Sequence, residues 1–320
     1  MNAVITMIND KGVIVHPDEI TERWEKTVLS SDINLFGIHP VGGQGSHNRV
    51  LDIALHGLPG NGNAVKDRLI KNGIAFEYEM HAMSMLLPRE LFDTHPEYFR
   101  LDEDGNRNAD YNCCSSNEDA LEIISEKAAF IAKTLPPSDH RYNLWLDDVK
   151  DKCCHCKDCE RFSSSDQAMR IYNAVLRGLR RVDPLATESY LAYVDTTVVP
   201  QKVAPDDGIF LEYAPFERNF HIPMENEVNA SSANDAKRLI EFFGRGKAKA
   251  LEYWLDNSLY SSWTKPPKKF VLDKEVAERD LEFYDRLGYT TVTTFACYLG
   301  SDYEELYGFP DLNGYIKYKE

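Results

Sequence analysis

The sequence predicts one α/β domain over residues 1–320, folded as a (β/α)8 barrel. Short apolar runs alternate with amphipathic stretches eight times, and this alternation is typical of parallel strands joined by right-handed helical crossovers. A length of 320 residues suits eight such units. The rival fold is a doubly wound open sheet, which normally has a glycine-rich phosphate loop after its first strand. Asp10-Lys11-Gly12 follows the first apolar run instead, and the barrel is therefore favoured.

Each expected element has its own local signal. The eight strands are expected at 3–8, 34–39, 74–79, 142–146, 190–194, 208–213, 250–255 and 291–295. Helices are expected at 17–29, 63–71, 116–135, 165–182, 236–243 and 274–287, with a last helical turn from Asp302. Gly73 and Gly288 end two of these helices, as glycine does in a left-handed C-cap. The loops after the third and fourth strands are long, and long loops in compact domains are often functional.

Composition and charge exclude several classes of protein. Acidic residues number 52 against 36 Lys and Arg, so the net charge is −16. This balance argues against binding to nucleic acid or to an anionic membrane, because both need a basic face. No run of 18 apolar residues occurs, so no membrane span is expected. The first ten residues lack the features of a signal peptide, which predicts a cytoplasmic chain or one whose leader was removed. The oligomeric state stays open.

Carboxylates, histidines and aromatic residues follow the expected strands. A barrel carries its working residues at the C-terminal ends of the strands, so these side chains should share one rim. Aromatic faces pack against the C–H faces of a sugar ring, and carboxylates bind its hydroxyls, so the mixture predicts a carbohydrate site. Many such residues also cap the next helix, which is the structural alternative. The rim residues are His39, Glu79, His81, Asp147, Asp148, Glu212, Tyr213, Arg218, His221, Trp254, Asp256, Asn257 and Tyr298.

Six of the seven cysteines lie between Cys113 and Cys159. Cys154, Cys156 and Cys159 have the close spacing of thiolate ligands, and Cys114 in the preceding long loop can supply a fourth. A closed set of four thiolates predicts a structural zinc rather than a catalytic one. Reduced thiols packed in a loop, or a labile disulfide, are the alternatives.

Several segments together resemble a known family. The segment from His95 to Arg107 is similar to the H-P-E-Y-F-A-L…G-x-R stretch of an uncharacterised, mostly bacterial family of glycoside-hydrolase-like barrels. Asp147-Asp148 and the three following cysteines resemble its N-D-G-G…C-x-C-x-x-C segment, although Val149-Lys150 replace the glycines. The segments around Ser165, Phe216 and Leu86 resemble further motifs of this family. This family in turn resembles the alpha-glucuronidase and beta-hexosaminidase barrels.

The resemblance implies a glycoside hydrolase with Asp148 as the general acid, since Asp148 matches the family Asp. Asp147 would orient the substrate, and Glu212 or Glu79 would be the second carboxylate. The expected partner is an oligosaccharide or glycoconjugate, with uronate or N-acetylhexosamine units, and Arg218 and His221 would bind a uronate carboxylate. Catalysis of this kind requires no cofactor. Two alternatives stay open: a non-catalytic carbohydrate-binding barrel, and a metal-dependent hydrolase with His39, His81 and Asp148 as ligands.

Overall fold

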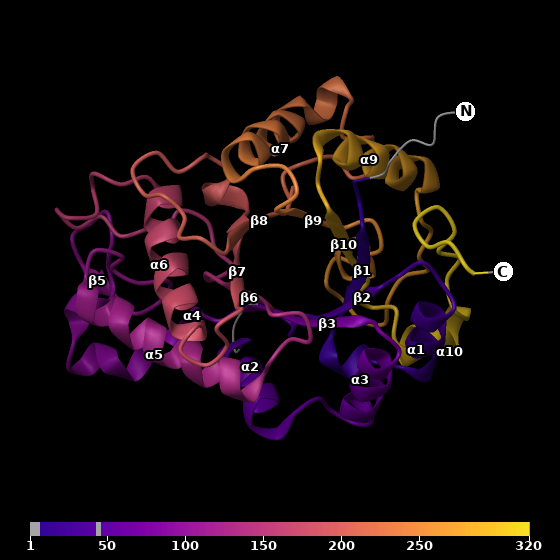
Figure 1. Ribbon diagram of the computed structural model, residues 1–320, viewed down its shortest axis with the longest axis horizontal. Coiled ribbons are helices and arrows are strands. Elements are labelled where there is room, and N and C mark those ends of the chain that lie inside the picture. The colour runs from indigo at the N-terminus through magenta and orange to yellow at the C-terminus, as the bar shows by residue number, and fades with distance from the viewer. Residues whose placement is uncertain (1–6, 43–45, 320) are drawn as a thin grey trace. The chain divides into compact units, whose positions relative to one another are not determined.

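A computed structural model describes residues 7–42 and 46–319, and it confirms the predicted barrel. Eight strands form a closed barrel in the order β1-β10-β9-β8-β7-β6-β3-β2, and helices connect them (Figure 1). The strand pairs whose register is resolved around the barrel are parallel, as expected when a helix returns the chain to the same end of the sheet. This is a (β/α)8 architecture, which keeps the C-terminal strand ends at one rim.

The strands are close to the predicted ones, except at the N-terminus. They are β1 (Asp10–Val15), β2 (Leu35–Ile38), β3 (Ala75–His81), β6 (Arg141–Trp145), β7 (Thr187–Ala192), β8 (Ile209–Tyr213), β9 (Ala248–Glu252) and β10 (Thr291–Phe295). A separate two-stranded hairpin consists of β4 (Arg100–Leu101) and β5 (Arg107–Asn108). The prediction for β10 is confirmed to the residue.

The α-helices include three that the sequence did not predict. They are α1 (Glu22–Leu29), α2 (Ser46–His56), α3 (Gly62–Lys71), α4 (Met83–Leu86), α5 (Glu118–Thr134), α6 (Ser164–Leu179), α7 (Ala230–Phe243), α8 (Asn257–Tyr260), α9 (Lys274–Leu287) and α10 (Ser301–Tyr307). The unpredicted ones are α2, α4 and α8, and the predicted helix 17–29 consists of a 3-10 turn at 17–19 followed by α1. Gly73 and Gly288 have positive φ after α3 and α9, which confirms both C-caps. No helix within the described residues is long and apolar enough to cross a membrane.

The first strand of the barrel was predicted wrongly. Residues 3–6 of the expected run lie outside the described residues, and Met7 and Ile8 belong to no strand. The strand is β1, which contains the Asp10-Lys11-Gly12 segment that the sequence suggested as a loop. Gly12 is required for packing rather than for a turn, because a Cβ there would lie 2.7 Å from Leu35 Cδ2. The C-terminal end of the strand therefore leads to His16 instead of Asn9.

The chain divides into two compact units. One comprises residues 1–39, 58–77 and 211–320 and holds β1, β2, β9, β10 and most of β8. The other comprises residues 40–57 and 78–210 and holds β6, β7 and the C-terminal half of β3. We call them the β1–β10 unit and the β6–β7 unit.

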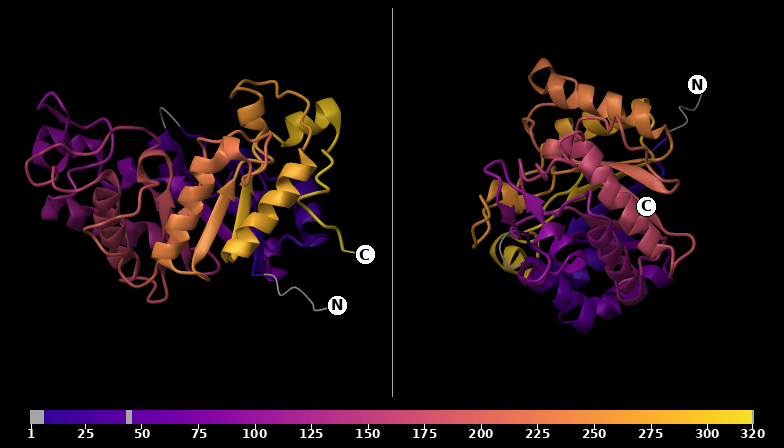
Figure 2. Two further views of the ribbon diagram at one scale, coloured as in Figure 1. Left: turned by 90° about the horizontal axis from the view of Figure 1, so that it is seen from above. Right: turned by 90° about the vertical axis from the view of Figure 1, so that its left-hand side faces the viewer.

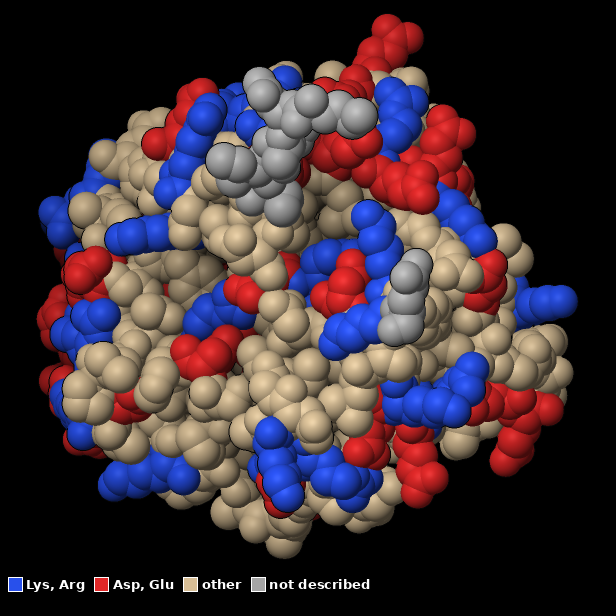
Figure 3. All heavy atoms as spheres, turned by 45° about the vertical axis from the view of Figure 1, so that its right-hand side comes forward, with Lys and Arg blue, Asp and Glu red and all other residues tan. Residues whose placement is uncertain are grey.

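In the β1–β10 unit, ionic groups occupy the barrel interior. The Lys249 ammonium lies 2.9 Å from Glu77 Oε2 and 2.9 Å from Glu212 Oε1, and all three side chains are buried. Helix α9 packs against β9 and β10 on the outside (Figure 2, left). Tyr315 donates a hydrogen bond of 2.7 Å to the Gly12 carbonyl and lies 3.1 Å from the Val292 carbonyl, which holds the C-terminal segment against β1 and β10. On the face that Figure 3 shows, acidic and basic side chains are intermingled.

In the β6–β7 unit, α5 and α6 pack closely side by side (Figure 1). Gly178 of α6 allows this contact, because a Cβ there would lie 1.9 Å from the Ser125 carbonyl oxygen of α5. Ser163 and Asp166 form a capping box at the start of α6. Asp166 Oδ1 also accepts hydrogen bonds from the backbone N–H groups of 201–203. The start of α6 is thus fixed from two sides, and α6 forms one wall of the pocket described next.

Candidate active-site pocket

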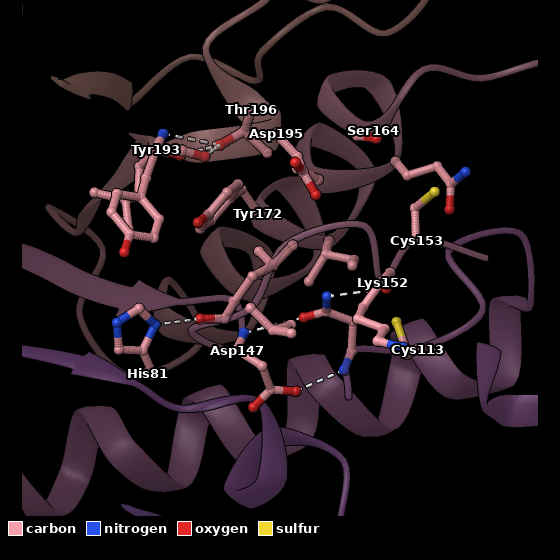
Figure 4. Close-up of a pocket in the computed structure, with 17 residues that line it drawn as sticks. His81, Cys113, Asp147, Lys152, Cys153, Ser164, Tyr172, Tyr193, Asp195 and Thr196 are labelled. Atoms are coloured by element: carbon pink, nitrogen blue, oxygen red, sulfur yellow. Dashed lines mark hydrogen bonds between the residues drawn. The ribbon is translucent and has the colours of Figure 1, made fainter. Parts of the chain in front are cut away.

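A pocket opens in the β6–β7 unit where β3, β6 and β7 end (Figure 4). His81 is the last residue of β3, Asp147 follows β6 by two residues, and Asp195 lies in the turn after β7. Residues of α6 and of the two long loops complete the wall. In a (β/α)8 barrel, this is the end at which catalytic residues lie. The lining residues are His81, Asn112, Cys113, Leu146, Asp147, Val149, Lys152, Cys153, Ser164, Gln167, Ala168, Ile171, Tyr172, Leu191, Tyr193, Asp195 and Thr196.

Asp147 is held firmly at one side of the pocket. Its Oδ2 accepts hydrogen bonds of 2.6 Å from Arg89 Nη2 and of 2.5 Å from the Asn112 backbone N–H. Asn112 Oδ1 in turn accepts the Asp147 N–H at 3.0 Å, and Arg89 also donates to the Asn112 carbonyl. Hydrogen bonds from a guanidinium and a backbone N–H hold the carboxylate in one orientation. Asp147 can therefore present a fixed carboxylate oxygen to a ligand.

Asp148, the predicted general acid, lies elsewhere. Its side chain is exposed and does not line the pocket. Its Oδ2 faces Gly42, at 3.5 Å from where a Cβ would lie. Successive side chains of an extended chain point to opposite sides, so Asp147 and Asp148 separate as the chain leaves β6. A general acid must reach the leaving oxygen, and the position of Asp148 gives no support for that role.

His81 has a defined orientation and tautomer. Its Nδ1 lies 2.5 Å from the Leu146 carbonyl oxygen, and its ring meets the Trp145 ring edge-on with centroids 5.2 Å apart. A carbonyl can only accept, so Nδ1 carries the hydrogen and Nε2 is the basic nitrogen of the neutral ring. The sequence predicted His81 as a substrate-binding residue, and the pocket includes it.

Three pocket residues were missed from the sequence. Asp195, Tyr193 and Tyr172 lie on one side of the pocket in Figure 4, and Asp147 lies on the other. Burial raises the pKa of the Tyr172 phenol well above its ordinary value. Asp195 accepts a hydrogen bond from the Asp151 N–H. The signal for Asp195 was available, because it is the first acid after the predicted fifth strand.

The two glutamates predicted as the second carboxylate are both fully buried. Glu212 is engaged in the interior ion pair with Lys249, at 2.9 Å. Glu79 lies on β3, where its register partner on β6 is Asn143. We now assign Glu212 to the barrel interior, because its carboxylate is already paired with a buried ammonium.

Tyr213, Arg218 and Trp254 were predicted to bind substrate, but all three side chains are buried under the helices. The Tyr213 hydroxyl donates to the Ser232 carbonyl at 2.8 Å. Arg218 forms ion pairs of 2.8 Å with Glu252 and 2.7 Å with Asp280, and the Trp254 indole donates to the same Asp280. Burial raises the pKa of Glu252 to about 7. These side chains have structural partners, so we assign them to the packing of α7 and α9.

A second group of polar residues lies at the rim of the β1–β10 unit. His16 Nδ1 is 2.8 Å from the His39 carbonyl, and the His39 ring meets Phe295 edge-on with centroids 5.2 Å apart. The backbone N–H of Tyr298 donates to both carboxylate oxygens of Glu19, at 3.0 and 2.9 Å. Burial raises the pKa of Glu19 to about 8. His16 and Glu19 were missed because β1 was placed too early in the sequence.

The other predicted residues of this unit hold the chain around α8. Asp256 caps α8 by accepting from the N–H groups of Ser258 and Leu259, at 3.0 and 3.3 Å. Asn257 donates to the Lys268 carbonyl at 3.0 Å. His221 is exposed and stacks on Tyr260, with ring centroids 5.7 Å apart. These hydrogen bonds show that Asp256 acts as a helix cap, which is the structural alternative to substrate binding.

Four cysteines gather beside the pocket. The Sγ atoms of Cys114, Cys154, Cys156 and Cys159 all lie within 4.8 Å of one another. These are the four residues that the sequence singled out as metal ligands. Among the side chains that the structure describes (7–42 and 49–319), no other group of three or more His, Cys, Asp or Glu residues has such an arrangement.

The fold and the pocket define a (β/α)8 barrel with polar residues at the C-terminal ends of its strands. Residues 61–241, more than half of the chain, match the family model described as Domain of unknown function (DUF4838), so the chain belongs to that family. No curated protein matches the chain.

Solved structures with a similar fold include glycoside hydrolases. The GH42 beta-galactosidase Gan42B of G. stearothermophilus is 14% identical with a TM-score of 0.51, and the similarity covers 91% of this chain and 51% of that one. A cold-adapted beta-galactosidase of Rahnella sp. R3 has the same identity and coverage with a TM-score of 0.49. A GH5-4 endoglucanase of Clostridium longisporum is 10% identical with a TM-score of 0.48, over 88% of this chain and 79% of that one. At these identities the likeness shows the fold alone. The chain spans about half the length of the two galactosidases.

Proposed function

We propose that the chain is a glycoside hydrolase that acts on an oligosaccharide or glycoconjugate in the pocket of the β6–β7 unit. The observation that carries the proposal is the presence of two carboxylates, Asp147 and Asp195, in one pocket at the C-terminal ends of neighbouring strands. Glycoside hydrolysis needs two carboxyl groups around one glycosidic bond. The pocket also contains Tyr172, Tyr193 and His81, which suit the C–H faces and hydroxyls of a sugar.

The two carboxylates would have different roles. The Arg89 guanidinium fixes the orientation of the Asp147 carboxylate, which would stabilise positive charge that develops on the sugar ring. Asp195 would supply the proton for the leaving oxygen. Asp147 would also be the second carboxylate that the reaction requires, as the base that takes a proton from the attacking water or as the nucleophile, and this division of roles needs no cofactor.

Substrate specificity is a separate part of the proposal. The uronate hypothesis depended on Arg218, and that guanidinium is paired with Glu252 and Asp280. We therefore propose an oligosaccharide substrate in general and keep uronate-containing and N-acetylhexosamine-containing glycans as members of the panel to be tested.

The test compares Asp147→Asn, Asp195→Asn and Asp148→Asn on any glycan that the wild-type chain cleaves. We expect kcat to fall by about 10²–10⁴-fold for the first two variants, the usual effect of losing a catalytic acid or base. Asp148→Asn should keep near-normal turnover because its side chain lies outside the pocket. Asp67→Asn is the matched control, an exposed aspartate of α3 with the same change of charge. Full turnover by both pocket variants, or its loss in Asp148→Asn alone, would overturn the assignment.

One observation favours a non-catalytic carbohydrate-binding barrel. Oδ2 of Asp147 already accepts two strong hydrogen bonds, which restrain its movement toward a reacting carbon. Calorimetric binding to a glycan panel, with no hydrolysis of any bound member, would support this second function over the first.

A further inference from the structure

We propose that Cys114, Cys154, Cys156 and Cys159 bind one structural Zn²⁺ ion. Cys114 comes from the long loop between β3 and α5, and the other three cysteines come from the loop between β6 and α6. All four residues are buried, with at most 8% of their surface exposed, and none of them forms a disulfide bond. The ion would therefore join two loops that are far apart in the sequence.

The sulfur–sulfur distances match a tetrahedral zinc site. A Zn–S bond is about 2.3 Å, so the edge of a regular ZnS₄ tetrahedron is about 3.8 Å. The Sγ of Cys114 lies 3.6 Å from that of Cys156 and 3.8 Å from that of Cys159. A disulfide would require about 2.05 Å. The cluster is thus spaced for a common ligand at its centre rather than for pairwise bonds.

Polar groups around the sulfurs would stabilise negative charge. The Leu101 backbone N–H donates to Cys154 Sγ at 3.3 Å, and Arg107 Nη1 lies 3.9 Å from the same atom. The Ser116 hydroxyl oxygen lies 3.2 Å from Cys159 Sγ. Four thiolates around one Zn²⁺ carry a net charge of −2, and donors of this kind offset it and orient the ligands. Four neutral thiols would carry no charge for these donors to offset.

The protein also fixes the ligand backbone in advance. Gln167 of α6 bonds both backbone groups of Cys154, accepting from its N–H at 3.0 Å and donating to its carbonyl at 3.0 Å. Leu101 of the β4–β5 hairpin packs against the cluster and helps to cover it. A closed site with four protein ligands leaves no position for a substrate, so the role is structural. Cys113 and Cys153, adjacent to two of the ligands, line the pocket, so the ion would also fix that wall.

The direct test is the metal content of the full chain purified under reducing conditions without chelator. We expect one zinc per chain by inductively coupled plasma mass spectrometry. Replacement by Co²⁺ should give the intense d–d absorption of a tetrahedral site and thiolate-to-cobalt charge transfer. Cys156→Ser and Cys159→Ser should lower the zinc content severalfold, whereas Cys113→Ser, a buried neighbouring cysteine outside the cluster, should leave it unchanged. Less than a tenth of an equivalent of metal in the wild-type chain, an iron-only site, or full zinc content in both ligand variants would overturn the proposal.

A second measurement covers variants that fail to fold. Stepwise addition of a mercurial thiol reagent to the wild-type chain should release zinc in proportion to the cysteines modified, as followed by a chromogenic chelator. Mass spectrometry of the untreated chain should find all seven cysteines reduced. A disulfide between any two of the four cluster cysteines would exclude the zinc site.

Discussion

Glu19 shows how one buried carboxyl can make stability depend on pH. Its side chain is buried at the rim of the β1–β10 unit and accepts two hydrogen bonds from the Tyr298 N–H. Burial raises its pKa from 4.5 to about 8, and the Tyr298 bonds and Lys265 oppose this shift. The folded state therefore holds the Glu19 proton more tightly than the unfolded chain does.

Glu19→Gln should flatten part of the pH dependence of unfolding. Because the folded state binds this proton more tightly, the raised pKa adds to the free energy of unfolding. This contribution is fully present below about pH 4.5 and is lost as the pH rises through about 8. The wild-type free energy of unfolding should thus decline across this window, and the variant, which keeps an acceptor for Tyr298, should decline less. Urea titrations at pH 5 and pH 8.5 measure the difference. Glu22→Gln, an exposed residue of α1, is the control, and equal slopes in all three proteins would contradict the prediction.

At single residues, the sequence predicted the place of a residue near a strand end better than the direction in which its side chain points. Trp254 was expected at the end of the seventh strand, but β9 ends at Glu252, and the indole instead contacts Asp280 of α9. Arg218 was expected to bind an anion, and it does bind two carboxylates, yet both belong to the protein. Which way such side chains point depends on the register of strands and helices, and a single sequence does not encode that register locally.

Among the elements, the pair α5 and α6 depends on a single small residue. Gly178 lies near the C-terminal end of α6, where the Ser125 carbonyl of α5 leaves no room for a methyl group. The close approach of the two helices therefore requires glycine at this position.

Gly178→Ala should destabilise the fold although alanine favours helices. The added Cβ would clash with a backbone atom at 1.9 Å, so one helix must move, at a cost of about 3 kcal/mol, the upper part of the usual range for overpacking. Arg177→Ala, an exposed position of the same helix, should change the free energy of unfolding by less than about 0.5 kcal/mol. Chemical denaturation measures both, and a Gly178→Ala protein as stable as the wild type would refute the packing argument.

Elements with strong periodicity could be predicted from the sequence, and elements shaped by their neighbours could not. The bounds of α9 and β10 match the prediction because their apolar spacing and the Gly288 C-cap are local signals. β1 was missed because Gly12 suggests a turn. In the structure Gly12 lies within the strand, where the Leu35 side chain of the adjacent strand leaves no room for a Cβ. The four cysteines that the sequence grouped lie together, and three of them are close in sequence, whereas their role as metal ligands stays a prediction.

For the whole molecule, the ionic groups of the barrel interior connect three strands. Lys249 of β9 contacts Glu77 of β3 and Glu212 of β8, and the three side chains are at most 1% exposed. The sequence alternation predicted the barrel, but it did not identify Lys249 and Glu77 as residues of its interior. We infer that Lys249 offsets the cost of burying two carboxylates.

Lys249→Met should be strongly destabilising because it keeps the volume and removes the charge. Breaking a buried ion pair by removing one partner costs about 3–5 kcal/mol. Lys247→Met changes an exposed lysine just before the same strand and should have little effect. Thermal and urea unfolding distinguish the two variants. If Lys249→Met unfolds at the wild-type urea concentration, the cluster contributes nothing to stability.

The pairing of β1 with β10 has a consequence for biosynthesis. These strands lie side by side although Asp10 and Thr291 are separated by nearly the whole chain. While a ribosome is still making the segment that becomes β10, β1 and β9 each have an unpaired edge, and such edges readily join other chains. The edges of β1 and β9 therefore stay exposed in the nascent protein until β10 emerges from the ribosome. Its dependence on chaperones would be greatest in that period.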